Sequence, residues 1–270
     1  MIIIVVLLLL YLYLIKPSGK HKSDFKPYEE RYIAHRGLFN NKDITENSLV
    51  AFKKASNQGF GIELDVQLTT DNKLVVYHDA SLKRISGIDK LVYDCSYEEL
   101  QGYHLLNEDE RIPLFEEVLE VIDPLTPLII EIKPDGRYLE TVKRTVDALK
   151  DYQGIYCLES FNPFVVKWLK DNHPEIIRGQ LAYNHFMDES QQSILAKFVL
   201  TNLLFNFMTR PDFIAYDHHH ASSFTYHLLR KLFKTENVAW TIKSEKELKD
   251  AKHNGYDIMI FDSFMPKGSN

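Results

Sequence analysis

From Tyr32 to the end of the chain, stretches typical of β-strands alternate with stretches typical of α-helices. This alternation predicts a parallel α/β architecture, and a length of 270 residues suits one domain of α/β-barrel size or two smaller ones. If the sheet closes into an eight-stranded barrel, one of the strand candidates must be a hairpin partner or irregular, because there are nine of them. The candidates are residues 32–35, 60–67, 74–78, 127–132, 154–160, 177–182, 213–217, 237–242 and 257–262.

The chain begins with an uninterrupted apolar run over residues 2–15. As a helix, this run would rise about 21 Å, against a hydrocarbon core of roughly 30 Å. A secretory signal is the alternative, but the basic start and the small-residue cleavage site that it needs are both absent. We therefore predict a single-pass membrane anchor over residues 1–16, followed by a basic juxtamembrane linker over residues 17–31.

Charge and cysteine content suggest where the remaining chain works. No lysine or arginine precedes the apolar run and five follow it between Lys16 and Arg31, which predicts a cytoplasmic position for the domain; an outward-facing domain is the alternative. Cys95 and Cys157 lack the spacing of metal ligands and are expected to be free thiols. The net charge of −6, without a dominant basic stripe, argues against a nucleic-acid partner.

Residues 61–79 contain the densest group of potentially catalytic side chains. Glu63 and Asp65 alternate with aliphatic residues, so a strand places both carboxylates on one face. A turn at Asp71-Asn72 leads into a second short strand that ends in His78-Asp79. Two adjacent carboxylates repel each other unless a cation lies between them, so this stretch by itself indicates either a cation site or a half-buried hairpin with a polar face.

Polar residues also follow the other early strand candidates. His35-Arg36 ends the first strand, and Glu131 and Lys133 end the strand that begins near residue 128. The carboxyl ends of the strands of a β/α barrel meet at one mouth, so these groups are expected to lie together with the residues 61–79. Oxygen ligands suit Ca²⁺ or Mg²⁺, guanidinium and ammonium groups suit a phosphate, and histidines suit acid–base chemistry. The sequence thus predicts a metal site beside an anion site.

Three motifs in this order resemble the signature of the glycerophosphodiester phosphodiesterase family: His35-Arg36, Glu63-x-Asp65 and His78-Asp79. Further matches are Glu46-Asn47-Ser48, Ile112-Pro113, Glu131-Ile132-Lys133, Ser160-Phe161 and Trp240-Thr241. The resemblance covers about residues 32–262. It implies a TIM (β/α)₈ barrel over residues 32–265, with a small insertion after the third strand; the polar residues 80–112, which interrupt the alternation, are expected to be this insertion.

The resemblance also implies an activity, the hydrolysis of a glycerophosphodiester to sn-glycerol 3-phosphate and an alcohol with a divalent cation, Ca²⁺ or Mg²⁺. By position, it implies metal ligands at Glu63, Asp65 and Glu131. It further implies an acid–base pair of His35 and His78, with phosphate contacts from Arg36 and Lys133. Trp240 is a possible wall of the substrate pocket. The family usually has a small residue at position 159 and an asparagine at position 243, where this chain has Glu159 and Lys243.

Two alternatives and two minor expectations complete the prediction. A lysophospholipase D that acts on membrane lysolipids would use the same residues with a different alcohol pocket, whereas a non-catalytic binding module would be expected to have lost some of them. Asn47 is expected to cap the following helix. Residues 218–220 are three consecutive histidines; on a strand their side chains point to alternate faces, so we favour no metal site there.

Overall fold

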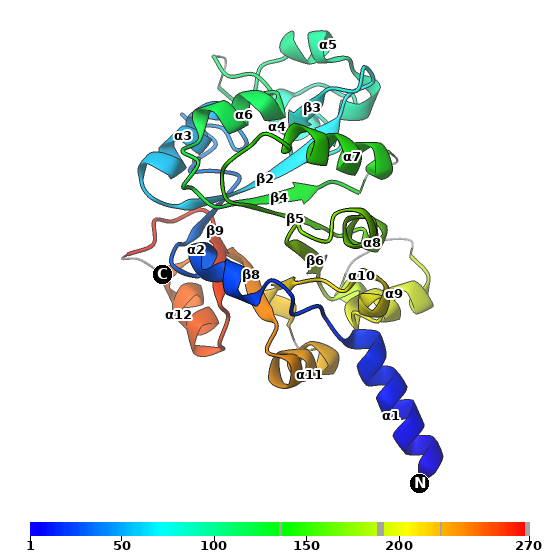
Figure 1. Cartoon of the computed structure of the whole chain (residues 1–270). Coiled ribbons are helices and arrows are strands. Elements are labelled where there is room, and N and C mark those ends of the chain that lie inside the picture. The colour runs from blue at the N-terminus through cyan, green and yellow to red at the C-terminus, as the bar shows by residue number, and fades with distance from the viewer. Residues whose placement is uncertain (108, 135–136, 188–191, 222, 268–270) are drawn as a thin grey trace.

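The computed structural model describes residues 1–107, 109–134, 137–187, 192–221 and 223–267. Eight parallel strands close into a barrel in which β1 pairs with both β2 and β9 (Figure 1). The barrel strands are β1 (Ile33–His35), β2 (Gly61–Leu68), β4 (Leu128–Ile132), β5 (Tyr156–Ser160), β6 (Arg178–Ala182), β7 (Phe213–Asp217), β8 (Glu236–Ile242) and β9 (Ile258–Phe261). The remaining strand, β3 (Leu74–Val76), pairs antiparallel with β2 and is the hairpin partner among the nine strand candidates. The predicted TIM barrel is confirmed.

Helices cover the outside of the barrel between successive strands. The helices that follow the barrel strands are α3 (Leu49–Asn57), α6 (Phe115–Val121), α7 (Tyr138–Ala148), α8 (Pro163–Asn172), α9 (Ile194–Thr201), α10 (Asn206–Thr209), α11 (Phe224–Phe233) and α12 (Glu245–His253). Serine side chains begin several of them: Ser48, Ser223 and Ser244 each accept a hydrogen bond from a backbone N–H of the first turn. We had expected Asn47 to cap α3. This prediction is wrong, because Ser48 occupies the capping position.

Side-chain alternation along the strands creates two apolar layers. In β2, Ile62 and Leu64 face outward and join the core under the helices. Inward-facing residues from other strands, among them Ile129, Phe213 and Ile260, form a second cluster inside the barrel. Because strand side chains alternate, the inward positions of β2 are left to Glu63 and Asp65. The barrel interior is thus apolar at the lower end, where the strands begin, and polar at the upper end, where the strands finish.

Residues 17–31, predicted as a linker, instead close the lower end of the barrel. They contain η1 (Lys22–Phe25) and α2 (Lys26–Glu29), from which Phe25 and Tyr28 enter the interior cluster fully buried. The ring of Phe25 meets that of Phe213 edge-on at 5.7 Å between centroids. This segment is thus part of the domain, because two apolar side chains that stand among charged residues in the sequence are buried in the barrel interior.

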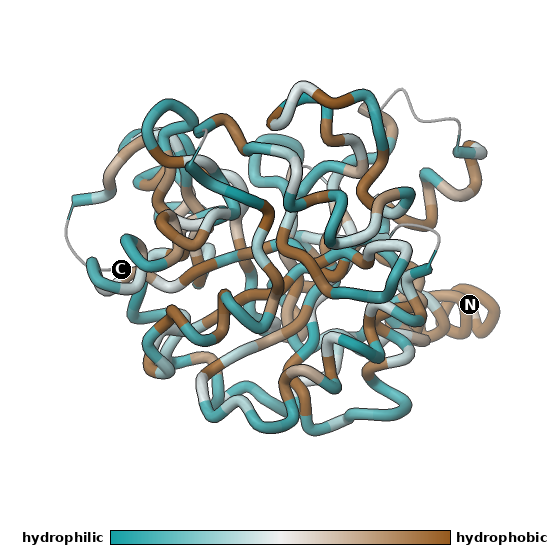
Figure 2. Tube along the Cα trace, turned by 90° about the horizontal axis from the view of Figure 1, so that it is seen from above, coloured by the Kyte–Doolittle hydropathy of each residue, from teal (hydrophilic) through white to brown (hydrophobic). Residues whose placement is uncertain are grey.

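The apolar start of the chain forms α1 (Ile2–Ile15), which has 14 residues and extends away from the barrel (Figures 1 and 2). Within the described residues, no helix is both long and apolar enough to cross a membrane. The predicted single-pass anchor is therefore wrong, and the predicted cytoplasmic position of the domain, which rested on it, loses its basis. The end of α1 is held by the domain instead: Ile15 is buried, and Asn206 donates to its carbonyl at 2.9 Å.

Residues 80–112 follow β3 and lie over the β2–β3 hairpin. Their described part contains α4 (Lys83–Ser86), η2 (Val92–Asp94) and α5 (Tyr97–Gln101). Apolar side chains of this segment and of β3 form a separate small cluster, which includes Val92, Cys95 and Leu100. Cys95 and Cys157 are both free and buried.

Candidate active site

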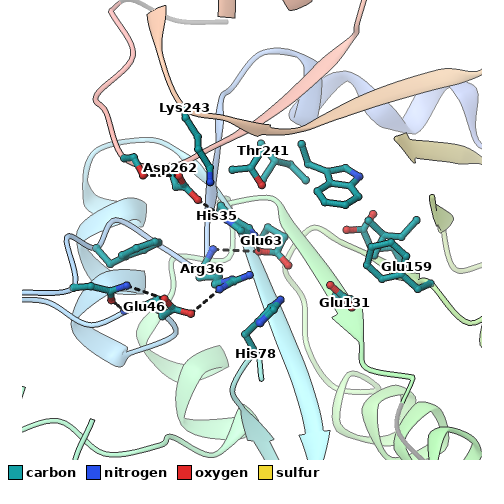
Figure 3. A pocket seen from close by; sticks show the side chains of 17 residues that line it. His35, Arg36, Glu46, Glu63, His78, Glu131, Glu159, Thr241, Lys243 and Asp262 are labelled. Carbon is teal, nitrogen blue, oxygen red and sulfur yellow. Dashed lines mark hydrogen bonds and ion pairs between the residues drawn. The ribbon is translucent and has the colours of Figure 1, made fainter. Parts of the chain in front are cut away.

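A cavity of about 370 Å³ opens at the carboxyl ends of the barrel strands (Figure 3). Its polar wall is contributed by β1, β2, β4 and β5 and by the segments that follow β1, β3, β8 and β9. Apolar side chains line the opposite part. The lining residues are His35, Arg36, Phe39, Asn41, Glu46, Glu63, His78, Glu131, Glu159, Phe161, Leu181, Trp240, Thr241, Lys243, Ile260, Asp262 and Ser263.

Three carboxylates meet at the wall of this cavity. Glu63 and Asp65 lie on the inward face of β2, and the strand register places Asp65 beside Glu131 of β4. One oxygen from each of the three lies within 4.8 Å of the others, and the side chains are almost fully buried. Asp65 does not itself line the cavity, because Arg36, Lys133 and Asn47 contact its carboxylate and cover it. The sequence-based placement of these three groups in one cluster agrees with the structure.

Each of the two histidines is oriented by an aspartate. Nδ1 of His35 lies 2.9 Å from Asp262 Oδ2, and Nδ1 of His78 lies 2.6 Å from Asp79 Oδ1. A carboxylate at Nδ1 keeps the proton on that nitrogen and leaves Nε2 available for proton transfer. Nε2 of His35 is 3.9 Å from Oε2 of Glu63, so this ring faces the carboxylate cluster.

His78 reaches the cavity by a different route from the one expected. From the sequence, we expected His78 at the end of a third strand, among the carboxyl ends that meet at the mouth of the barrel. In the structure β3 runs antiparallel to the extended end of β2, and Tyr77 N donates to the carbonyl of Asp65 at 3.0 Å. The hairpin therefore folds back to the level of the carboxylates and brings His78 with it.

Arg36 and Lys133 supply the positive charge of the site. Arg36 has a left-handed backbone, with φ of 55°, and its NH1 donates to Glu46 at 2.6 Å. Its backbone N–H donates to Glu63 at 3.1 Å. Lys133 Nζ lies 2.9 Å from both Asp65 and Glu131 and does not line the cavity. A strained non-glycine backbone beside a buried ion cluster is common at active sites.

Burial of several carboxylates together perturbs their protonation. Burial, reinforced by Asp65 and Glu131, raises the pKa of Glu63 well above its usual range. Burial likewise raises the pKa of Glu131, although Lys133 opposes this. For Asp65 burial acts in the same direction, but Lys133, His78 and Arg36 outweigh it and hold its pKa well below the ordinary value. The cost of burying three carboxylates side by side therefore favours protonation of Glu63 and Glu131, or a cation bound between the three groups.

Four side chains complete the site although the sequence analysis gave none of them a role there. Glu46 binds Arg36, Asp262 orients His35, and Asn47 donates to Asp65 Oδ2 at 2.9 Å. Glu159 is a fourth buried carboxylate in the wall, and burial, then Glu131 and Asp65, raise its pKa well above normal. Its alternation with Cys157 on β5 was the available signal for an inward position. Asp262 could have been suspected only from its place at a strand end.

Trp240 stands in the apolar wall of the cavity. Its ring meets that of Phe161 at 5.6 Å between centroids in an edge-to-face arrangement. Leu181 and Ile260 continue this wall. The cavity therefore has a charged side, with the histidines and carboxylates, and an apolar side on which a non-reacting part of a substrate can pack.

A TIM barrel with oriented histidines, buried carboxylates and an arginine at its mouth is equipped to hydrolyse a phosphodiester. Comparison with known proteins agrees: residues 35–265 match the glycerophosphoryl diester phosphodiesterase family. The chain belongs to this family of phosphoric diester hydrolases. The fold and the family match thus point to one class of protein.

Individual relatives carry two different names. The chain is 34% identical over 156 residues to the lysophospholipase D GDPD1 of Mus musculus, covering 53% of this chain and 48% of the relative. It is 42% identical over 110 residues to a glycerophosphodiester phosphodiesterase of Bacillus altitudinis, covering 38% and 44%. The matches to these two relatives thus span about half of each relative's length or less.

Solved structures extend the similarity over most of the chain. A phosphodiesterase of Oleispira antarctica, determined in complex with the product sn-glycerol-3-phosphate, superposes with a TM-score of 0.70 and 26% identity, covering 86% of this chain and 92% of that one. A glycerophosphodiester phosphodiesterase of Thermotoga maritima superposes with a TM-score of 0.65 and 25% identity, covering 86% and 95%.

Proposed function

We propose that this protein hydrolyses glycerophosphodiesters to sn-glycerol 3-phosphate and an alcohol, using a divalent cation and a pair of histidines. The observation that carries the proposal is the pairing of His35 and His78 with Asp262 and Asp79 beside a buried carboxylate cluster. The family match and the product named for the Oleispira structure support the same substrate class.

The carboxylates of this cluster fit a hard divalent cation. Glu63, Asp65 and Glu131 offer oxygen atoms only, which suits Mg²⁺ or Ca²⁺. Glu159 lies beside Glu131 on the neighbouring strand, and its buried Oε2 has no hydrogen-bond partner among the described residues, so a further oxygen lies next to this ligand group. When bound, the cation would supply charge stabilisation for the phosphate oxygens.

The chain's own groups then divide the remaining work. Arg36, held in place by Glu46, contacts the phosphate. Lys133, which is paired with Asp65 and Glu131 outside the cavity lining, would contact the phosphate only if a bound cation replaced it at these carboxylates. One histidine removes a proton from the nucleophile and the other donates a proton to the leaving alcohol. Burial lowers the pKa of His35, which favours the neutral form that accepts a proton.

The size of the alcohol remains the point on which a second function differs. A lysophospholipase D activity would use the same reacting groups and place the lipid part on the apolar wall formed by Phe161, Leu181 and Trp240. The name of the mouse relative supports this candidate.

A product assay distinguishes the two functions. We would incubate the protein with glycerophosphocholine, glycerophosphoethanolamine, glycerophosphoglycerol and a lysophospholipid in parallel, and quantify the released alcohol and phosphate ester. Release of sn-glycerol 3-phosphate from the water-soluble diesters is expected. Exclusive turnover of the lysophospholipid would favour the second function, and turnover of none of the four would contradict both.

A further inference from the structure

A second group of metal-ligand side chains lies outside the active site. His218 and His219 belong to η4 (His218–His220), which directly follows β7, and Glu247 lies in the first turn of α12. On a strand, neighbouring histidines would point to opposite faces, which was the reason to expect no site here. The tight 3₁₀ turn removes that objection, and the rings of His218 and His219 lie 3.9 Å apart between centroids.

The ligand atoms of these three residues already surround a common point. Glu247 Oε2 lies 3.7 Å from Nε2 of His218 and 3.9 Å from Nε2 of His219, and the three ligand atoms lie within 4.8 Å of one another. Bonds of about 2.0–2.1 Å in tetrahedral geometry place ligand atoms roughly 3.4 Å apart. Binding a metal ion therefore requires only small side-chain movements.

Hydrogen bonds on the far side of the ligands fix their direction. Nδ1 of His219 lies 3.2 Å from Asp217 Oδ1, so the proton is held on Nδ1 and the lone pair of Nε2 points toward Glu247. This is the arrangement in which a carboxylate supports a metal-bound histidine. Glu247 Oε2 is itself anchored by the backbone N–H of Lys243 at 2.7 Å.

Of the three consecutive histidines, His218 has the most buried ring. Its Nε2 lies 3.3 Å from the carbonyl of Thr241, a contact that a bound metal would replace. The side chains of His219 and Glu247 are 48% and 31% exposed, so the remaining coordination positions are open to water.

We propose that His218, His219 and Glu247 form a second metal site, which binds a divalent transition-metal ion of the zinc class with three protein ligands. Two imidazoles and one carboxylate suit Zn²⁺ or Co²⁺, whereas the all-oxygen active-site cluster suits Mg²⁺ or Ca²⁺. Thr241 and Lys243, which contact this group, also line the active-site cavity. The second site thus lies at the rim of that cavity.

The test is a titration of metal-free protein with Co²⁺ in saturating Mg²⁺, followed by visible absorption and by calorimetry. Mg²⁺ occupies the carboxylate cluster, so Co²⁺ reports on the second site. We expect one equivalent to bind with the visible bands of nitrogen coordination. The same equivalent should remain in Glu63→Gln, which alters only the active-site cluster.

Variants then assign the ligands. His219→Gln and Glu247→Gln should each weaken Co²⁺ binding by more than tenfold, and Asp217→Asn by about 10- to 100-fold through loss of ring orientation. His220→Gln is the matched control, because His220 is adjacent and binds Asp217 but does not belong to the ligand group. Circular dichroism checks that each variant is folded. No bound equivalent in the parent protein, or equal binding by His219→Gln and His220→Gln, would overturn the proposal.

Discussion

The pairing of His35 with Asp262 permits a quantitative test of the proposed acid–base mechanism. Nδ1 of His35 lies 2.9 Å from Asp262 Oδ2, and the two side chains are only 16% and 10% exposed. In Asp262→Asn, the geometry is nearly conserved but the charge that stabilises a protonated imidazole is removed. A hydrogen bond to a charged group contributes about 1.5–3 kcal/mol. Since about 1.4 kcal/mol corresponds to tenfold in rate, we expect turnover to fall about 10- to 150-fold.

The decisive measurement is a double-mutant cycle on kcat. His35→Ala alone should abolish most of the activity, and adding Asp262→Asn in that background should change the rate by less than about threefold, because Asp262 acts through His35. KM should change little in Asp262→Asn if the aspartate has no contact with substrate. Additive losses in the cycle, or an unchanged kcat in the single variant, would refute the role of Asp262 as a positioning residue.

Three further predictions concern the cation, the barrel floor and pH. Chelation should abolish turnover and Mg²⁺ or Ca²⁺ restore it, and Glu63→Gln should lower kcat on the order of a hundredfold; full activity in excess chelator would contradict the metal assignment. Phe25→Ala should lower the free energy of unfolding in urea by about 3–5 kcal/mol, whereas Phe207→Ala, at a position 40% exposed, should lower it much less. Equal effects would argue against the burial of Phe25 at the closed end of the barrel. Burial, and then the charges of Asp257 and Glu29, raise the pKa of Glu236 in the folded protein to about 7. The folded protein therefore binds a proton at Glu236 more tightly than the unfolded chain does. The resulting stabilisation is complete below about pH 4.5 and is lost as the pH rises through 7. At pH 8, the free energy of unfolding of Glu236→Gln in urea should therefore exceed that of the parent protein by about 1–2 kcal/mol. At pH 4.5 the two proteins should have nearly the same free energy of unfolding. No difference at pH 8 would disprove this.

Local pattern was sufficient for the inward carboxylates. The alternation around Glu63 and Asp65 determines which face of β2 they occupy, because strand side chains have a period of two. The spacing of strands and helices likewise determined the barrel, and the surplus strand candidate was correctly expected to be irregular or a hairpin partner. These features depend on neighbours in the chain, which the sequence displays directly.

Local pattern was misleading at the N-terminus. The apolar run 2–15 has the composition of a membrane span, but its helix ends after 14 residues, and its last residue, Ile15, is buried against the domain. Phe25 and Tyr28 stand among charged residues, and nothing in their spacing indicates that they close the barrel. Whether an apolar side chain meets lipid, solvent or protein depends on the surface that folding places beside it.

Contacts between distant segments were decided only by closure of the barrel. Asp262 contacts His35, 227 residues away in the chain, because β9, the last strand of the barrel, pairs with β1, the first. The 3₁₀ turn after β7 and the start of α12 bring Glu247 to His218 and His219 in the same way. The sequence by itself determined which faces carry the reactive groups, and the tertiary structure determined their partners, because partner choice depends on strand order and on where each connection returns to the mouth.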